Sequence, residues 1–154
     1  MYPLGPMANR GISGLPWVKI GPMAMLKRIL YLQALVWAAA GVALVLLPGL
    51  LLHGLFDQPD YREYAWLRIV GIQGFVLALV MVMVAHRIDT LWWWSWAFAL
   101  MAAAMASVFT LNAAFGLPDS AAAWPWWIFA GVDWLFALSL AWGLSRAGQE
   151  KPIV

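Results

Sequence analysis

The sequence contains no cysteine and few charged residues, and each absence excludes whole classes of protein. Without cysteine, the chain can form no disulfide framework and can offer no thiolate to a metal or a substrate. Charged residues make up only 10% of the 154 residues and hydrophobic residues 65%, whereas soluble domains contain about 25% charged residues. The composition therefore predicts an integral membrane protein that has the lipid bilayer as a partner.

Basic residues are also few, and the net charge is only +2. In a soluble chain, an excess of basic residues would suggest nucleic acid binding. Here the lysines and arginines flank apolar segments, where such residues set the orientation of a chain across a membrane. We therefore expect no nucleic acid partner.

Four apolar segments are each long enough to cross a bilayer, because about 20 apolar residues in a helix span roughly 30 Å of hydrocarbon. They cover residues 29–52, 64–85, 91–115 and 124–144. The loops between them are short, which favours antiparallel neighbours. We predict an all-α integral membrane protein with an up-down-up-down four-helix bundle at 26–146. A flexible tail rich in proline and glycine is expected at 1–25, and a short polar tail at 147–154.

Several residues predict where these helices begin, bend or end. Pro48 lies near the far end of the first span and is expected to kink or unwind its last turn. Asp57 or Pro59 could begin the second helix, and Asp89 or Thr90 could provide the N-cap of the third.

Lysine and arginine predict the orientation of the bundle, because short cytoplasmic segments retain these residues. If both termini share one side, that side holds Arg10, Lys19, Lys27, Arg28, Arg87, Arg146 and Lys151. The loops of the opposite side hold Arg62 together with Asp57, Asp60, Glu63 and Asp119. We therefore predict a multi-pass protein of the cell membrane with both termini in the cytoplasm.

Asp133 lies within an apolar segment, where an ionised carboxylate is costly unless a partner neutralises it. Arg68 is the obvious partner, because it also lies within an apolar segment. At 1.5 Å per residue, Arg68 and Asp133 lie about 6 and 12 Å below the outer ends of their helices, and a long arginine side chain can cover the difference. Small residues beside each, such as Gly71 and Ala137, permit close helix contact. We predict that the two residues meet, as a structural ion pair or in a ligand-binding site.

Four further polar residues are candidates for the same outer cluster: Asn112, Gln73, His53 and Tyr64. Asn112 is expected about one turn from the outer end of the third span, whereas helical spacing places Gln73 on a different face from Arg68. Such a cluster indicates either an outward-facing pocket for a small ligand or proton, or hydrogen-bonded neighbours that fix the helix arrangement.

The sequence offers no metal, cofactor or catalytic site that can be recognised by its motif. Its two histidines, His53 and His86, are expected on opposite sides of the membrane and so cannot share a metal or a haem. The chain also lacks a zinc-protease motif, a phosphate-binding glycine loop and a serine-hydrolase motif. We predict no metal, no cofactor and no enzymatic activity.

Tryptophan and alanine are the abundant residues that bear on packing. The twelve tryptophans concentrate at 92–96 and 124–127, and indole prefers the membrane interface, so we expect two interfacial belts. Small residues at four-residue spacing give the third span two close-packing faces: Ala99, Ala103 and Ser107, and Ala102, Ala106 and Thr110. One face is expected to serve the bundle, and the other another copy, a partner subunit or lipid.

Two hypotheses about function follow. The first is a non-enzymatic accessory or assembly component that packs through its helices as a homo-oligomer or in a larger membrane complex. The alternative is a carrier or binder of a small or lipophilic ligand, with Asp133 as a proton or cation site and Arg68 controlling its charge state. A cavity that reaches Asp133 would favour the binder, and direct packing of Arg68 on Asp133 would favour a structural role.

Overall fold

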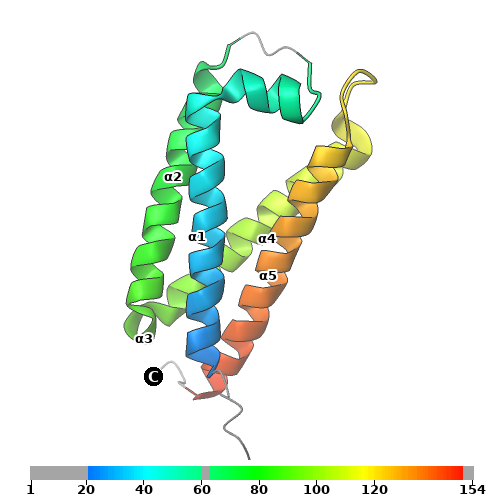
Figure 1. The fold of residues 1–154 in the computed structure, drawn as a ribbon. Helices are drawn as coiled ribbons and strands as arrows, with labels where there is room; N and C mark the ends of the chain where they lie inside the picture. Colours follow the sequence, from blue (N-terminus) through cyan, green and yellow to red (C-terminus); the bar gives the residue numbers. More distant parts are fainter. Residues whose placement is uncertain (1–20, 60–62, 151–154) are drawn as a thin grey trace, which may run out of the picture.

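The computed structural model describes residues 21–59 and 63–150, which form helices and loops and include no strand (Figure 1). Residues 1–20 and 151–154, which include most of the predicted N-terminal tail, lie outside the described residues. Helix α1 begins at Pro22 and α5 continues to Glu150. The helical region therefore extends four residues farther than the predicted domain 26–146 at each end.

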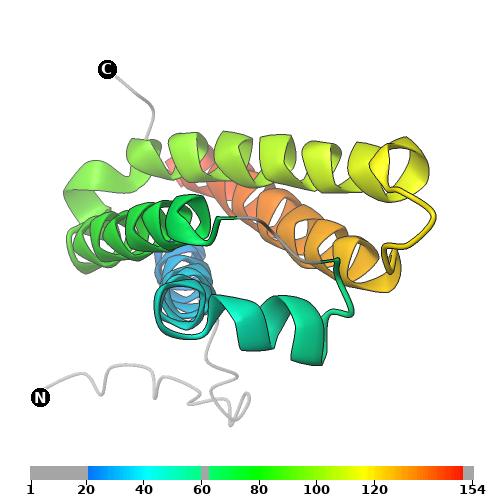
Figure 2. The ribbon, with the colours of Figure 1, turned by 90° about the horizontal axis from the view of Figure 1, so that it is seen from above.

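The first span ends at a proline and is followed by a helical segment with another direction. Helix α1 (Pro22–Leu46) has Leu47 as its C-cap residue, and a second helical stretch begins at Pro48 and continues into the π-helical segment η1 (Leu50–Leu55). Because proline has no backbone N–H to donate, regular helical bonding is interrupted here, and η1 runs sideways from the end of α1 toward the start of α5 (Figures 1 and 2). The predicted kink at Pro48 is confirmed. The predicted end of the span at residue 52 is wrong, because α1 ends at Leu46.

Helix α2 (Ala65–His86) matches the predicted second span within one residue at each end. Its N-cap position is Tyr64, so the prediction that Asp57 or Pro59 begins this helix is wrong. Asp57 instead has a left-handed backbone, with a φ of 48°, just after Phe56, the C-cap residue of η1. Aspartate tolerates this conformation better than most residues, and it turns the chain away from the helical path.

The third span consists of four consecutive pieces rather than one helix. They are α3 (Ile88–Leu91), the 3-10 turn η2 (Trp92–Trp94), α4 (Ser95–Leu111) and the π-helical turn η3 (Asn112–Gly116). Arg87 is the N-cap residue of α3, so the predicted N-cap at Asp89 or Thr90 is wrong. Thr90 lies inside α3, and its Oγ1 donates a hydrogen bond to the Arg87 carbonyl at 3.1 Å.

Four helical stretches are long and apolar enough to cross a membrane: Pro22–Leu46, Ala65–His86, Ile88–Gly116 and Trp124–Gln149. The last stretch belongs to α5 (Trp124–Glu150), which extends beyond the predicted end of the fourth span at residue 144. The N-terminal end of α1, the short helix α3 and the C-terminal end of α5 lie at one end of the molecule, the lower end in Figure 1. Segment η1 and the connection at 117–123 lie at the opposite end.

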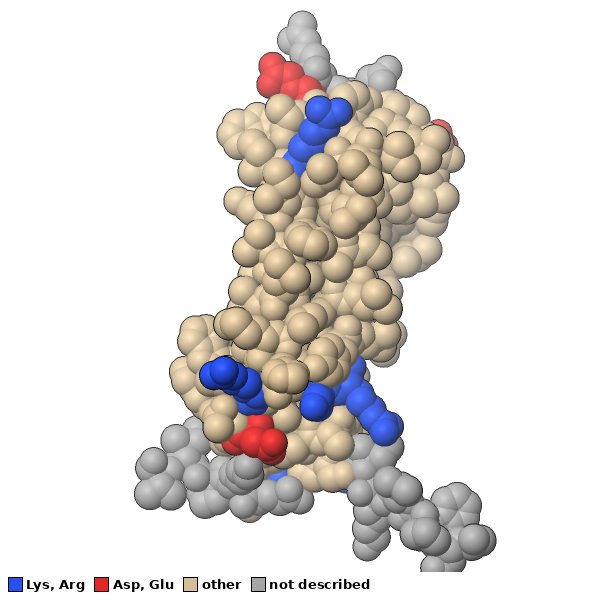
Figure 3. All heavy atoms as spheres, turned by 60° about the vertical axis from the view of Figure 1, so that its left-hand side comes forward, with Lys and Arg blue, Asp and Glu red and all other residues tan. Residues whose placement is uncertain are grey.

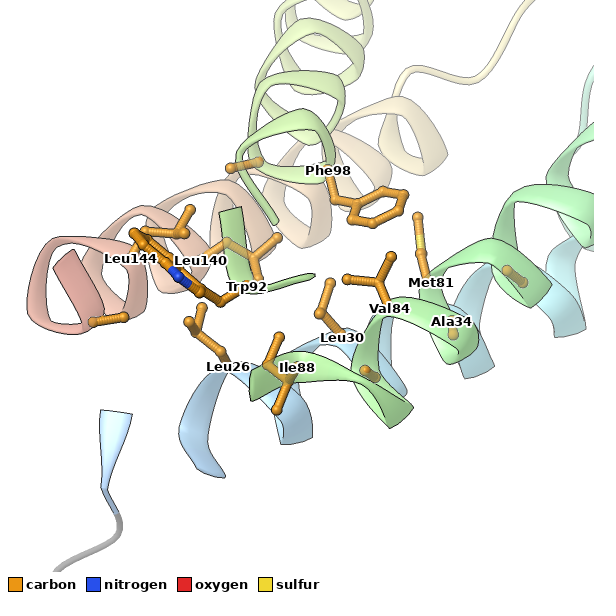
Figure 4. Close-up of a cluster of buried hydrophobic side chains, with 14 residues drawn as sticks. Leu26, Leu30, Ala34, Met81, Val84, Ile88, Trp92, Phe98, Leu140 and Leu144 are labelled. Atoms are coloured by element: carbon orange, nitrogen blue, oxygen red, sulfur yellow. The ribbon is translucent and has the colours of Figure 1, made fainter. Parts of the chain in front are cut away.

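The helices associate as two pairs, with α1 packed along α2 and α4 packed along α5. Contacts between α1 and α5 join the pairs. All four spans meet near the lower end, where a buried apolar cluster draws on each of them, as Figure 4 shows. Its largest side chains are Leu26, Leu30, Met81, Val84, Ile88, Trp92, Phe98, Leu140 and Leu144. A second, smaller cluster of Ala102, Phe136 and Ala137 packs against Ile29.

Gly41 and Gly71 allow α1 and α2 to touch through their backbones. A Cβ atom added at Gly41 would lie 2.6 Å from the Gly71 carbonyl oxygen, and one added at Gly71 would lie 2.7 Å from the Gly41 carbonyl oxygen. Only glycine fits such an approach, which is common where helices cross closely in membranes. This crossing sets the distance between α1 and α2.

Candidate functional site

Asp133 is buried inside the bundle, although it carries a carboxylate. It lies on α5 with a side chain that is 7% exposed, one turn from Phe136 and Ala137 of the smaller apolar cluster. Within residues 21–59 and 63–150, the carboxylate forms neither an ion pair nor a hydrogen bond. A carboxyl group in such surroundings can take up a proton or bind a ligand that offers a hydrogen-bond donor or a positive charge.

Besides Asp133, the structure buries a second polar residue, Gln33, which the sequence analysis did not identify. It lies on α1 with a side chain that is 0% exposed, and neither Nε2 nor Oε1 has a hydrogen-bond partner in the part of the chain that the structure describes. An unsatisfied buried amide costs free energy, so native proteins seldom contain one without a reason. A glutamine in the middle of an apolar segment was the available signal.

Gln33 and Asp133 lie at a similar level of the bundle. Leu26 of α1 lies against Gly143 of α5, and Ile29 packs against the cluster that contains Phe136, so residue numbers rise along α1 as they fall along α5. Gln33 is one turn beyond Ile29, and Asp133 is one turn beyond Phe136 in the same direction. The interior of the bundle therefore holds a buried amide on α1 and a buried carboxyl group on α5 at a similar level.

The predicted pair of Arg68 and Asp133 is not formed in this structure. Arg68 is exposed on α2, and α2 packs against α1 rather than along α5. Asp133 is buried on α5, which packs along α4, so the two side chains belong to different helix pairs. The prediction rested on depth estimated from residue number, and depth alone does not place two helices side by side.

The other predicted site residues are distributed over separate elements. His53 Nε2 and Tyr64 OH lie 3.2 Å apart and link η1 to the start of α2. Asn112 is half-buried in η3, next to Gly116, and Gln73 is exposed on α2. The structure brings His53 and Tyr64 together but does not gather the predicted residues around Asp133.

Gln58 links the two loops at the upper end, and sequence reasoning assigned it no role. Its Nε2 donates hydrogen bonds of 2.9 Å to the carbonyls of Phe56 and Ala122, and Trp126 Nε1 donates to its Oε1 at 3.5 Å. Around it, Phe56 stacks edge-on against Phe129 with ring centroids 5.3 Å apart. These contacts hold the η1 segment against the start of α5. A loop glutamine carries no motif, so only the tertiary contacts reveal it.

Two hollows on the described residues lie away from Asp133. One of about 510 Å³ at the lower end is lined by Pro22, Ser145, Arg146 and Gln149. One of about 250 Å³ between α1 and α2 is lined by Gly41, Val42, Val45, Leu46, Ile72 and Phe75. Among the described residues no three histidine, aspartate or glutamate side chains gather into a group that could hold a metal ion.

The described residues therefore form an all-helical protein with four helices that are long and apolar enough to cross a membrane. In comparisons with known proteins, no family model, no curated protein and no solved structure matches the chain.

Proposed function

We propose that this chain is a non-enzymatic, multi-pass membrane component that assembles with another membrane chain through the outer face of its helices. The observation that carries the proposal is Gln73, an amide on the outer face of α2. No hydrogen bond from Gln73 to any part of residues 21–59 or 63–150 satisfies this amide.

Gln73 lies deep within its span. It is eight residues from the start of α2 at Ala65 and thirteen from its end at His86, which places it about 12 Å and about 20 Å from the two helix ends. The residues one turn away on the same face, Ile69 and Val76, are exposed and apolar. A glutamine side chain is too short to reach water from this depth.

In hydrocarbon, an amide without a hydrogen-bond partner is unfavourable, and polar side chains of membrane helices commonly hydrogen-bond across to another helix. Because the chain's own helices leave Gln73 exposed, a partner helix from another chain is the natural source of that bond. This favours an assembly role over an isolated bundle.

The proposal includes an orientation in the membrane, with the helices up-down-up-down and both termini in the cytoplasm. Among the described residues, Lys27, Arg28, Arg87 and Arg146 belong to the elements at the lower end of Figure 1. Figure 3 shows basic side chains near both ends of one face and none in the band between them. Basic residues at the lower end support a cytoplasmic position for that end.

The mass of the purified protein tests the proposal. The full chain, solubilised from its own membrane in a mild detergent, is expected in a species with more protein mass than the 17.1 kDa of one chain, measured by light scattering. Gln73→Leu should shift it toward 17.1 kDa, whereas Leu100→Ala, at an exposed position on α4, should not. A wild-type protein found only as the single chain would contradict the proposal.

A second candidate function is favoured by the buried Asp133 and Gln33. We propose that this level of the bundle binds a proton or a small hydrogen-bonding ligand, since its two buried polar groups have no partners in the described residues and a guest could supply them. In liposomes that enclose a pH-sensitive dye, a pH gradient should then dissipate faster with wild-type protein than with Asp133→Asn. Equal rates for wild type, Asp133→Asn and empty liposomes would exclude the proton version.

A further inference from the structure

The exposed face of α2 carries a regular pattern centred on Gln73. Its residues follow one another at alternating spacings of three and four: Trp66, Ile69, Gln73, Val76, Val80 and Met83. Val80 is half-buried and the other five are exposed. This spacing is the seam of a left-handed helix pair, the commonest packing of membrane helices. We call these six residues the α2 seam.

The α2 seam is apolar except for Gln73, which lies in its middle. A single polar residue within an apolar seam fixes the register and the number of helices in a coiled coil, because any other alignment leaves it without a partner. Figure 3 shows a broad band of the molecule without charged side chains on the side that includes α2. Charge therefore does not oppose the approach of a second helix there.

Membrane insertion makes the seam self-complementary. Two copies of one chain enter a bilayer with the same orientation, so their α2 helices run parallel and equal residues meet at equal depth. In a twofold pair each residue near the axis faces its own counterpart. An amide suits this arrangement, because it offers both a donor and an acceptor to an identical amide.

We infer that the α2 seam binds the α2 seam of a second copy of this chain, with a Gln73-to-Gln73 hydrogen bond at its centre. The inference rests on the proposed assembly function and names its partner. Helix α2 is suited to the role because it packs within the chain mainly on α1, which leaves five of the six seam residues exposed, while Val80 also touches the buried core.

The absence of cysteine provides a direct test, since any disulfide must come from an introduced residue. The full chain is purified with Val76→Cys, on the seam, or with Val82→Cys, which is also exposed but lies about 120° away around α2. Each variant is reconstituted alone in phosphatidylcholine vesicles at several lipid dilutions and oxidised with copper phenanthroline. A disulfide requires Cα atoms within about 7 Å, so cross-linking reports close contact.

We expect covalent dimers from Val76→Cys and few from Val82→Cys. Adding Gln73→Leu to Val76→Cys should raise the dimer dissociation constant roughly 3- to 30-fold, as expected for the loss of one interhelical hydrogen bond in a membrane. Gln73→Asn retains an amide and should lose less than Gln73→Leu, which separates loss of the hydrogen bond from general damage to the fold.

Equal cross-linking at positions 76 and 82, or dimerisation unchanged by Gln73→Leu, would overturn the inference. If the purified chain stays monomeric in vesicles while Gln73→Leu still reduces the mass of the complex from the native membrane, the partner is another protein. In that case the assembly function stands and the second copy is refuted. If both experiments show a single chain, both proposals fail.

Discussion

Replacing Gly41 by alanine tests the closest contact in the structure. The added Cβ would lie 2.6 Å from the Gly71 carbonyl oxygen and 2.9 Å from the backbone nitrogen of Phe75, whereas ordinary contact begins at 3.4 Å. Both neighbouring atoms belong to the backbone of α2, so no side chain can rotate away. Helices α1 and α2 must separate, and contacts along their shared length weaken.

The cost can be bounded from general values. An added methyl group in a well-packed interior costs about 1–3 kcal/mol, and this exceeds the gain of up to about 1 kcal/mol when alanine replaces glycine in an open helix. We therefore expect Gly41→Ala to lower the free energy of unfolding by about 1–2 kcal/mol. Gly71→Ala should cost a similar amount. The double variant should cost less than the sum, because the first change already separates the helices.

Two other glycines provide matched controls in α5. A Cβ at Gly131 would meet nothing within 4 Å, so Gly131→Ala should leave stability unchanged or raise it. A Cβ at Gly143 would lie 2.8 Å from Leu26 Cδ2, the end of a flexible side chain, so Gly143→Ala should cost less than Gly41→Ala.

The measurement is reversible unfolding by sodium dodecyl sulfate in mixed micelles, followed by tryptophan fluorescence. The expected order of stability loss is Gly41→Ala largest, Gly143→Ala intermediate and Gly131→Ala smallest. Equal effects at positions 41 and 131 would refute the backbone contact between α1 and α2.

Three further predictions concern polar residues and use the same unfolding assay. Gln58→Leu removes the hydrogen bonds to the loop at Ala122 and should cost about 1–3 kcal/mol; no loss would show that the loops are held by their aromatic rings alone. Gln33→Met removes a buried amide without a partner in the described residues and should stabilise the protein by up to about 1 kcal/mol, so destabilisation would reveal a bound partner. The losses in free energy of unfolding caused by Arg68→Gln and Asp133→Asn should add within about 0.5 kcal/mol in the double variant. A larger coupling energy would show that the predicted ion pair forms.

The number of long apolar helices follows from local sequence. Apolar segments between turn residues mark them, and each helical stretch overlaps its predicted span, most closely at α2. The observed course of the chain differs most from the predicted one at Pro48 and at Asp57. There the chain leaves the helical path, and the sequence indicated a break at Pro48 without giving the direction of η1.

The candidate site was less predictable than the helices. Residue numbers give the depth of Arg68 and Asp133, but not which helices pack side by side. Because α2 packs on α1 and α5 packs on α4, the charged residues do not meet. Gln33 was overlooked because a single glutamine in an apolar segment does not reveal whether it faces lipid or the interior.

The sequence by itself determined that this protein consists of long apolar helices joined by short loops, since length, hydrophobicity and proline act locally along the chain. Only the tertiary structure decided which polar groups are enclosed and which face outward. Gly41 and Gly71 bring α1 and α2 into backbone contact, and this pairing leaves Gln73 exposed. Asp133 is buried instead, on α5, which packs along α4. The physical reason is that burial depends on how faces of different helices pack together, which residues far apart in sequence decide jointly.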